Sequence, residues 1–129
     1  MRRKLVLAPA AAVAALTLGL AAALAASSSD PGVTPTSVLL GGTAPLTGPA
    51  SAYASVARGA EAYFRYQNAR GGVAGRQIGY VYLDDAYNPA QTMQAVRQLV
   101  EQDKVFAVFN ALGTEQNLAV RDYLKAQGV

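Results

Sequence analysis

The sequence of 129 residues contains no cysteine, no histidine and no tryptophan. These absences exclude zinc sites built from cysteine or histidine, thiol redox motifs, and nucleophiles activated by a histidine base. Disulfide bonds cannot contribute to stability for the same reason. We therefore expect no cofactor, and any ligand must be held by hydroxyl, amide, charged or apolar groups.

The net charge is zero once the first residues of the chain are set aside. The chain carries eleven basic and eight acidic residues, and three of the basic ones are Arg2, Arg3 and Lys4. The eight basic residues that remain balance the eight acidic ones. Because no basic stretch with interleaved aromatic residues is left, the sequence indicates no nucleic-acid partner.

Residues 1–26 have the composition of a secretory signal peptide. Three basic residues precede an uncharged stretch over residues 5–26 that ends in small side chains. We expect cleavage after Ala25 or Ala26 and an exported protein that is periplasmic or otherwise extracytoplasmic. An uncleaved anchor is the alternative, since 22 uncharged residues could cross a bilayer. Half of the stretch is alanine and Pro9 interrupts its start, which favours cleavage.

The remainder of the chain alternates between apolar and helical patterns. A polar segment over residues 27–37 contains prolines, and we expect it to be a flexible linker. The domain itself is expected over residues 38–129, with the order βαβαβα. The strands are expected at residues 38–40, 78–83 and 105–109, and the helices at residues 55–69, from residue 89 onward, and at 114–127.

The fold class follows from the third strand and the connections. Residues 105–109 are five consecutive apolar residues, which is typical of a strand buried on both faces of a parallel sheet. Parallel neighbours need crossover connections, which the helices supply. The fold is therefore predicted to be α/β, a partial doubly wound parallel sheet. The third helix is expected to bury Leu118, Ala119, Tyr123 and Leu124.

A binding site in such a sheet lies beyond the carboxyl ends of the strands, where the strand order reverses. For this order the point lies between the first and third strands, where the loops over residues 43–53 and 110–114 converge. The helix that follows the second loop would favour a carboxylate or phosphate at its amino terminus. The candidate ligand-binding residues in these loops are Ser51, Tyr53, Leu112, Gly113 and Thr114.

Several of the polar residues also have a purely structural interpretation. Thr114 could be the N-cap of its helix, and Tyr53 could pack over the first helix. Asp84 and Asp85 could form an acid/base pair or a magnesium site. Adjacent side chains point apart on an extended segment, however, and these two precede a turn, which favours a role in forming that turn.

Five segments in order resemble the opening of the branched-chain amino acid type of substrate-binding protein of ABC importers. They are APLTGP at 44–49, RGAEA at 58–62, NARGGVAGR at 68–76, DDAYNP at 84–89 and LVEQDKV at 99–105. The resemblance implies the N-terminal lobe of a type I periplasmic-binding-protein fold. It also implies a receptor with two lobes that closes on a small solute and delivers it to a membrane permease.

The resemblance also implies roles for individual residues. In leucine, isoleucine and valine binders a hydroxyl at the start of the helix after the third strand holds the α-carboxylate of the ligand. That position falls on Thr114, beside Gly113, and a tyrosine lining the same cleft matches Tyr53. The implied partners are an amino acid or analogue and an ABC permease. Some relatives carry a disulfide at the positions of Tyr87 and Gly113, which this sequence lacks.

Residues 38–129 are too few for two lobes of ordinary domain size. We therefore expect an incomplete N-terminal lobe, which by itself binds no amino acid tightly and is not an enzyme. One alternative keeps the fold and makes the chain a ligand-sensing lobe of a signalling receptor. A weaker one is an enzyme that uses Asp84 and Asp85 with a metal.

Overall fold

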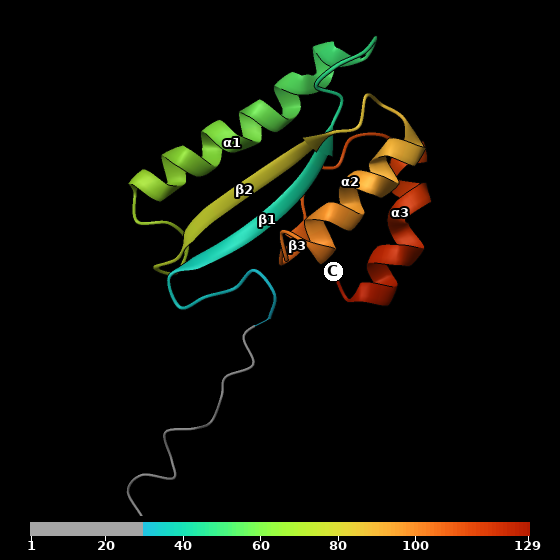
Figure 1. Cartoon of the computed structure of the whole chain (residues 1–129). Helices are drawn as coiled ribbons and strands as arrows, with labels where there is room; N and C mark the ends of the chain where they lie inside the picture. Colours follow the sequence, from blue (N-terminus) through green and yellow to red (C-terminus); the bar gives the residue numbers. More distant parts are fainter. Residues whose placement is uncertain (1–29) are drawn as a thin grey trace, which may run out of the picture.

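The computed structural model describes residues 30–129, and Figure 1 shows their arrangement. The expected signal peptide, residues 1–26, lies outside the described residues. Three parallel strands form a sheet with α1 on one face and α2 and α3 on the other (Figure 1). The predicted α/β class and element order are confirmed. The elements in chain order are β1 (Ser37–Ala44), the short 3-10 helix η2 (Ser51–Tyr53), α1 (Ala54–Ala69), β2 (Gln77–Asp84), α2 (Pro89–Glu101), β3 (Ala107–Val108) and α3 (Thr114–Gln127).

The strand order is β2-β1-β3, so β1 is central and the order reverses between β1 and β3. Strand β1 pairs with β2 along its whole length, from Ser37 opposite Gln77 to Ala44 opposite Asp84. It pairs with β3 over only two residues. The carboxyl ends of all three strands therefore meet at one edge of the sheet.

The third strand is shorter and more exposed than its apolar sequence predicts. Val105 is buried, but Phe106 and Phe109 are 42% and 43% exposed, and only Ala107–Val108 pair as a strand. Strand β3 has β1 on one side and no strand on the other among residues 30–129. The prediction that residues 105–109 form a strand buried on both faces is therefore wrong for this part of the chain, because β3 is an edge strand that is paired on one side only.

Residues 30–36 belong to the segment predicted as a flexible linker, but the structure holds them against the sheet. The Gly32 carbonyl accepts a hydrogen bond from the Leu39 N–H at 2.7 Å, and the Thr36 carbonyl accepts one from the Gln77 N–H at 2.8 Å. These contacts use backbone groups, which every sequence has, so the polar composition of the segment gave no sign of them.

Helix α2 begins as its sequence predicts. Asn88 is the N-cap, and its Oδ1 accepts hydrogen bonds from the Ala90 N–H at 2.9 Å and the Gln91 N–H at 3.3 Å. Pro89 occupies the first helical position, where its missing N–H costs nothing. The helix buries Val96 and Leu99 against the sheet.

Helix α3 has the predicted bounds but a different buried face. Gln116 and Val120 are buried, whereas Leu118 is 57% exposed and Ala119 is also exposed. The buried face is the one that packs against α2, where the Tyr123 hydroxyl donates to Glu101 Oε1 at 2.8 Å. Leu118 instead lines the cavity described below.

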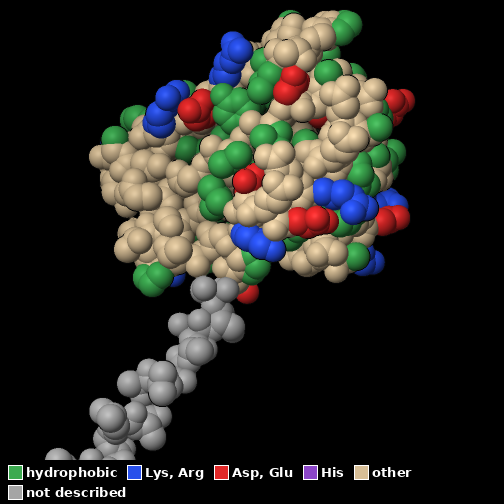
Figure 2. Space-filling view, viewed as in Figure 1, with side chains coloured by type: hydrophobic (Ala, Val, Ile, Leu, Met, Phe, Trp, Pro, Cys, Tyr) green, Lys and Arg blue, Asp and Glu red, His purple; other side chains and the backbone are tan. Residues whose placement is uncertain are grey.

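On the face that Figure 2 shows, acidic and basic side chains are interspersed over the helices and form no large patch of one sign. Two ion pairs on the surface each join residues one helical turn apart. They are Arg65 with Glu61 at 3.5 Å and Arg97 with Glu101 at 3.8 Å. Such pairs contribute little to stability. Within residues 30–129, no helix has both the length and the hydropathy that a membrane span requires.

Candidate functional site

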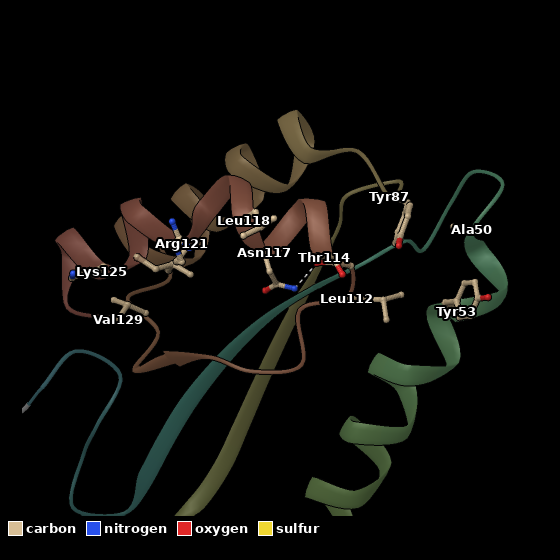
Figure 3. A pocket seen from close by; sticks show the side chains of 12 residues that line it. Ala50, Tyr53, Tyr87, Leu112, Thr114, Asn117, Leu118, Arg121, Lys125 and Val129 are labelled. Atoms are coloured by element: carbon tan, nitrogen blue, oxygen red, sulfur yellow. Dashed lines mark hydrogen bonds between the residues drawn. The ribbon is translucent and has the colours of Figure 1, made fainter.

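A cavity of about 1310 Å³ begins beyond the carboxyl ends of the strands, where the strand order reverses, and continues along α3. Three loops contribute to its wall: Ala50 and Tyr53 follow β1, Tyr87 follows β2, and residues 112–114 follow β3. Figure 3 shows Leu112 and Thr114 at the N-terminal end of α3. They face Ala50 and Tyr53, which lie just before the start of α1. The loops converge as the strand order predicts.

Four of the five candidate residues line this cavity, namely Tyr53, Leu112, Gly113 and Thr114. Ser51, the first residue of the short helix η2, does not line it, and its N–H donates to the Gly48 carbonyl at 3.1 Å. The Tyr53 side chain is exposed, so little of its ring is packed over α1. Contact of these residues with a ligand stays a prediction.

The first turn of α3 faces the cavity without a side-chain cap. Gly113 is the N-cap residue and Thr114 is the first helical residue, so the interpretation of Thr114 as the N-cap is wrong. Because glycine offers no side-chain acceptor, it leaves the first-turn N–H groups available to an anion. The Asn117 side chain fixes the loop that precedes α3. It donates hydrogen bonds to the Ala111 carbonyl at 2.9 Å and to the Gly113 carbonyl at 2.6 Å.

The far part of the cavity follows α3 and was not predicted as a site. It is lined by Leu118, Arg121, Leu124 and Lys125. Figure 3 shows Val129 beyond the end of the helix. These helical residues recur at steps of three and four from Thr114, so a stripe was visible in the sequence. Sequence reasoning assigned Leu118 and Leu124 to the core because an apolar stripe does not reveal what covers it.

Asp84 holds the loop after β1 next to the loop after β2. Its Oδ1 accepts hydrogen bonds from the Leu46 N–H at 2.8 Å, the Thr47 N–H at 3.2 Å and the Ala86 N–H at 3.0 Å. The Thr47 hydroxyl donates to Oδ2 at 2.5 Å. One carboxylate therefore fixes the path of two of the three loops that form the cavity.

Asp85 turns the other way and is buried. Its Oδ1 accepts a hydrogen bond from the Tyr87 N–H at 3.0 Å, and its Oδ2 accepts one from the Thr92 hydroxyl at 2.9 Å. The two adjacent carboxylates thus serve separate parts of the loop, as the turn interpretation predicts. Residues 30–129 contain no group of three or more metal-binding side chains of the histidine, cysteine or acidic kind.

The hydrogen bonds to Asp84 predict a pH dependence of stability. The bond from the Thr47 hydroxyl is the largest influence, partial desolvation opposes it, and the backbone N–H groups reinforce it, so that the pKa of Asp84 is lowered. A lowered pKa in the folded state adds stability above the unfolded-state pKa, and this stability is lost as the pH falls through the folded pKa.

We expect Asp84→Asn to lower the melting temperature most above about pH 5, with the difference from the wild type shrinking toward zero in acid. Thr47→Val, which removes one donor, should give a smaller difference with the same trend. Thermal unfolding followed by circular dichroism between about pH 2.5 and 7 measures both. A difference that stays constant over this range would show that Asp84 does not act through its charge.

Residues 37–129 match the family described as periplasmic binding protein. Leu/Ile/Val-binding protein homolog 3 of Brucella melitensis is 34% identical over 93 residues, which are 71% of this chain and 25% of that protein. Homolog 2 of Brucella abortus is 38% identical over 72 residues, which are 55% of this chain and 19% of that protein. The chain spans a quarter or less of the length of these curated relatives.

Solved structures show the same likeness. A fatty acid ABC transporter substrate-binding protein from Thermomonospora curvata superimposes with a TM-score of 0.66 at 31% identity, covering 75% of this chain and 25% of that one. A branched-chain amino acid transporter substrate-binding protein from Streptococcus pneumoniae, solved in complex with isoleucine, gives a TM-score of 0.67 at 27% identity. The alignment covers 73% of this chain and 27% of that one.

Proposed function

Because the chain belongs to the periplasmic binding protein family, we propose that it is the N-terminal lobe of the extracytoplasmic solute-binding component of an ABC importer. The proposed ligand is a branched-chain amino acid or a related small solute, and the proposed partner is a membrane permease. Residues 1–26 would direct export. The observation that supports this proposal most is the uncapped first turn of α3, which opens onto a cavity at the carboxyl edge of the sheet.

The proposed mode of binding uses the start of α3 for the carboxylate of the ligand. The first-turn N–H groups and the Thr114 hydroxyl would donate to it, and hydrogen bonds to a charged group are worth about 1.5–3 kcal/mol each. The helix dipole adds about 0.3–1 kcal/mol. Arg121 lies seven residues farther along the helix, about 10 Å away along the axis, so it is too distant to pair with the same carboxylate.

The proposed place of the ligand's apolar side chain is beside Leu112 and the ring of Tyr53. Both residues line the same part of the cavity as Thr114. A small-molecule site usually buries most of the surface of its ligand. The cavity is open here, and the relatives are about four times as long as the matched segment. We therefore infer that a second lobe closes over the ligand in the whole receptor.

Two expectations test this proposal on the chain itself. Isothermal titration of residues 27–129 with L-leucine should detect no binding of micromolar strength, whereas an NMR-monitored titration should detect weak, saturable binding.

Thr114→Val should raise the dissociation constant for L-leucine about tenfold, because one charge-assisted hydrogen bond is lost. Thr114→Ser keeps the hydroxyl and should bind like the wild type. Micromolar binding by the wild type, or equal binding by Thr114→Val, would contradict the proposal.

A further inference from the structure

Tyr87 has a backbone conformation that residues with side chains rarely adopt. Its φ is +59°, and Ala86 before it has a φ of +46°. Both values lie in the left-handed region, which is unfavourable for any residue other than glycine. Such conformations persist where surrounding groups enforce them, and they are common at binding sites. Tyr87 lines the cavity and is 45% exposed (Figure 3).

Two buried side chains hold the backbone of Tyr87 from opposite ends. Its N–H donates to Asp85 Oδ1 at 3.0 Å, and its carbonyl accepts from Gln116 Nε2 at 2.8 Å. Asp85 and Gln116 are 0% and 1% exposed. Asp85 belongs to the same loop, but Gln116 comes from the first turn of α3. The bond from Gln116 therefore links the loop after β2 to the helix that begins at the proposed carboxylate site.

Gln116 also lies directly against the cavity wall. A Cβ atom at Gly113 would overlap Gln116 Oε1 and would lie 3.0 Å from Cε2 of the Tyr87 ring. Gln116, Gly113 and Tyr87 thus form one packed group, in which only glycine fits at position 113. A displacement of Gln116 would disturb its hydrogen bond to the Tyr87 carbonyl.

The Gln116 side chain is not explained by stability alone. Its Oε1 is buried and has no hydrogen-bond partner within residues 30–129. A buried polar atom without a partner destabilises the folded state, and an apolar side chain of similar shape would avoid that cost. The feature that an apolar side chain would lack is the hydrogen bond to the Tyr87 carbonyl.

We propose that Gln116 is a positioning residue that fixes the left-handed backbone of Tyr87, so that the ring forms a wall of the ligand cavity beside Gly113. This inference rests on the proposed function for its effect on the ligand. The placement of Tyr87 itself does not depend on that function. Gln116 acts through Tyr87 and does not contact the ligand.

The test replaces Gln116 with methionine, which keeps the length of the side chain but has no N–H donor. Amide hydrogen exchange by NMR should be about tenfold faster at Tyr87 and Asn88, because the loop opens more often. The amides of Leu46 and Thr47, which Asp84 holds, should exchange as in the wild type. Gln127→Met, at an exposed position of the same helix, should change none of these rates.

Stability and affinity measurements distinguish a positioning role from a general structural role. Gln116→Met should unfold at nearly the same urea concentration as the wild type, because removal of the unpaired oxygen offsets the lost hydrogen bond to the Tyr87 carbonyl, yet it should bind L-leucine about fivefold more weakly. Gln116→Leu should behave alike. Unchanged exchange at Tyr87 and Asn88 would overturn the inference, as would faster exchange throughout the domain with lower stability. If the wild type shows no leucine binding, the proposed function fails, and the exchange rates alone still decide the role of Gln116.

Discussion

Leu99→Ala is expected to destabilise the domain by about 2–5 kcal/mol, the usual cost of emptying a leucine-sized space in a core. Leu99 is fully buried on α2. A Cβ atom at Gly41 in the central strand would lie 3.1 Å from both of its terminal methyl carbons, so the helix and the sheet are in close contact there. A domain of about 100 residues has only about 5–15 kcal/mol of stability in total, so a large part of it would be lost.

Urea unfolding monitored by circular dichroism measures this effect, and Leu118→Ala is the matched control. Leu118 has the same side chain on α3 but is 57% exposed. Its truncation should change the free energy of unfolding by no more than about 0.5 kcal/mol. Equal losses for the two variants would mean that the core does not lie between α2 and the sheet.

Gly113→Ala is expected to have the second large effect, at the start of α3. Gly113 has a φ of +109° and a ψ of +136°, a conformation that only glycine adopts readily. Backbone strain of this kind costs about 1–3 kcal/mol, and the new Cβ atom would also displace Gln116. We expect lower stability together with loss of leucine binding, because the displacement alters the wall next to Thr114.

Gly59→Ala provides a control with the opposite sign. Gly59 lies within α1, where no atom is within 4 Å of an added Cβ. Alanine there should stabilise the helix by about 0.5–1 kcal/mol. Urea unfolding of both variants, with NMR titration of leucine, compares them directly. A stabilising Gly113→Ala substitution would show that the turn before α3 is not constrained as described.

Local signals in the sequence predicted much of the fold. Asn88 and Pro89 specify the start of α2 through hydrogen bonds and a backbone angle that involve only their own helix. Likewise, the alternation of strands and helices predicted the order of the elements. The strand order then placed Tyr53 and Thr114 at one cavity, because parallel strands end at the same edge of the sheet.

The remaining features depend on neighbours that are distant in the sequence. The apolar sequence predicts that Phe106 is buried. It is exposed because β3 is an edge strand among the described residues. Gln116 is polar, yet it is buried, and its amide donates to the Tyr87 carbonyl, 29 positions away in the chain. The sequence distinguishes Tyr87 only through the resemblance, as a position where some relatives have a cysteine, because a left-handed backbone is not evident from the pattern of apolar residues.

The most direct test of the central claim is an NMR titration that follows the backbone amides of Gly113, Thr114 and Glu115. With L-leucine these signals should shift and saturate, because the carboxylate binds at the first turn of α3. Leucinamide has the same side chain but no carboxylate, and it should leave these signals unchanged. Equal shifts with both compounds, or leucine shifts confined to the distant part of the cavity near Arg121 and Lys125, would contradict the claim.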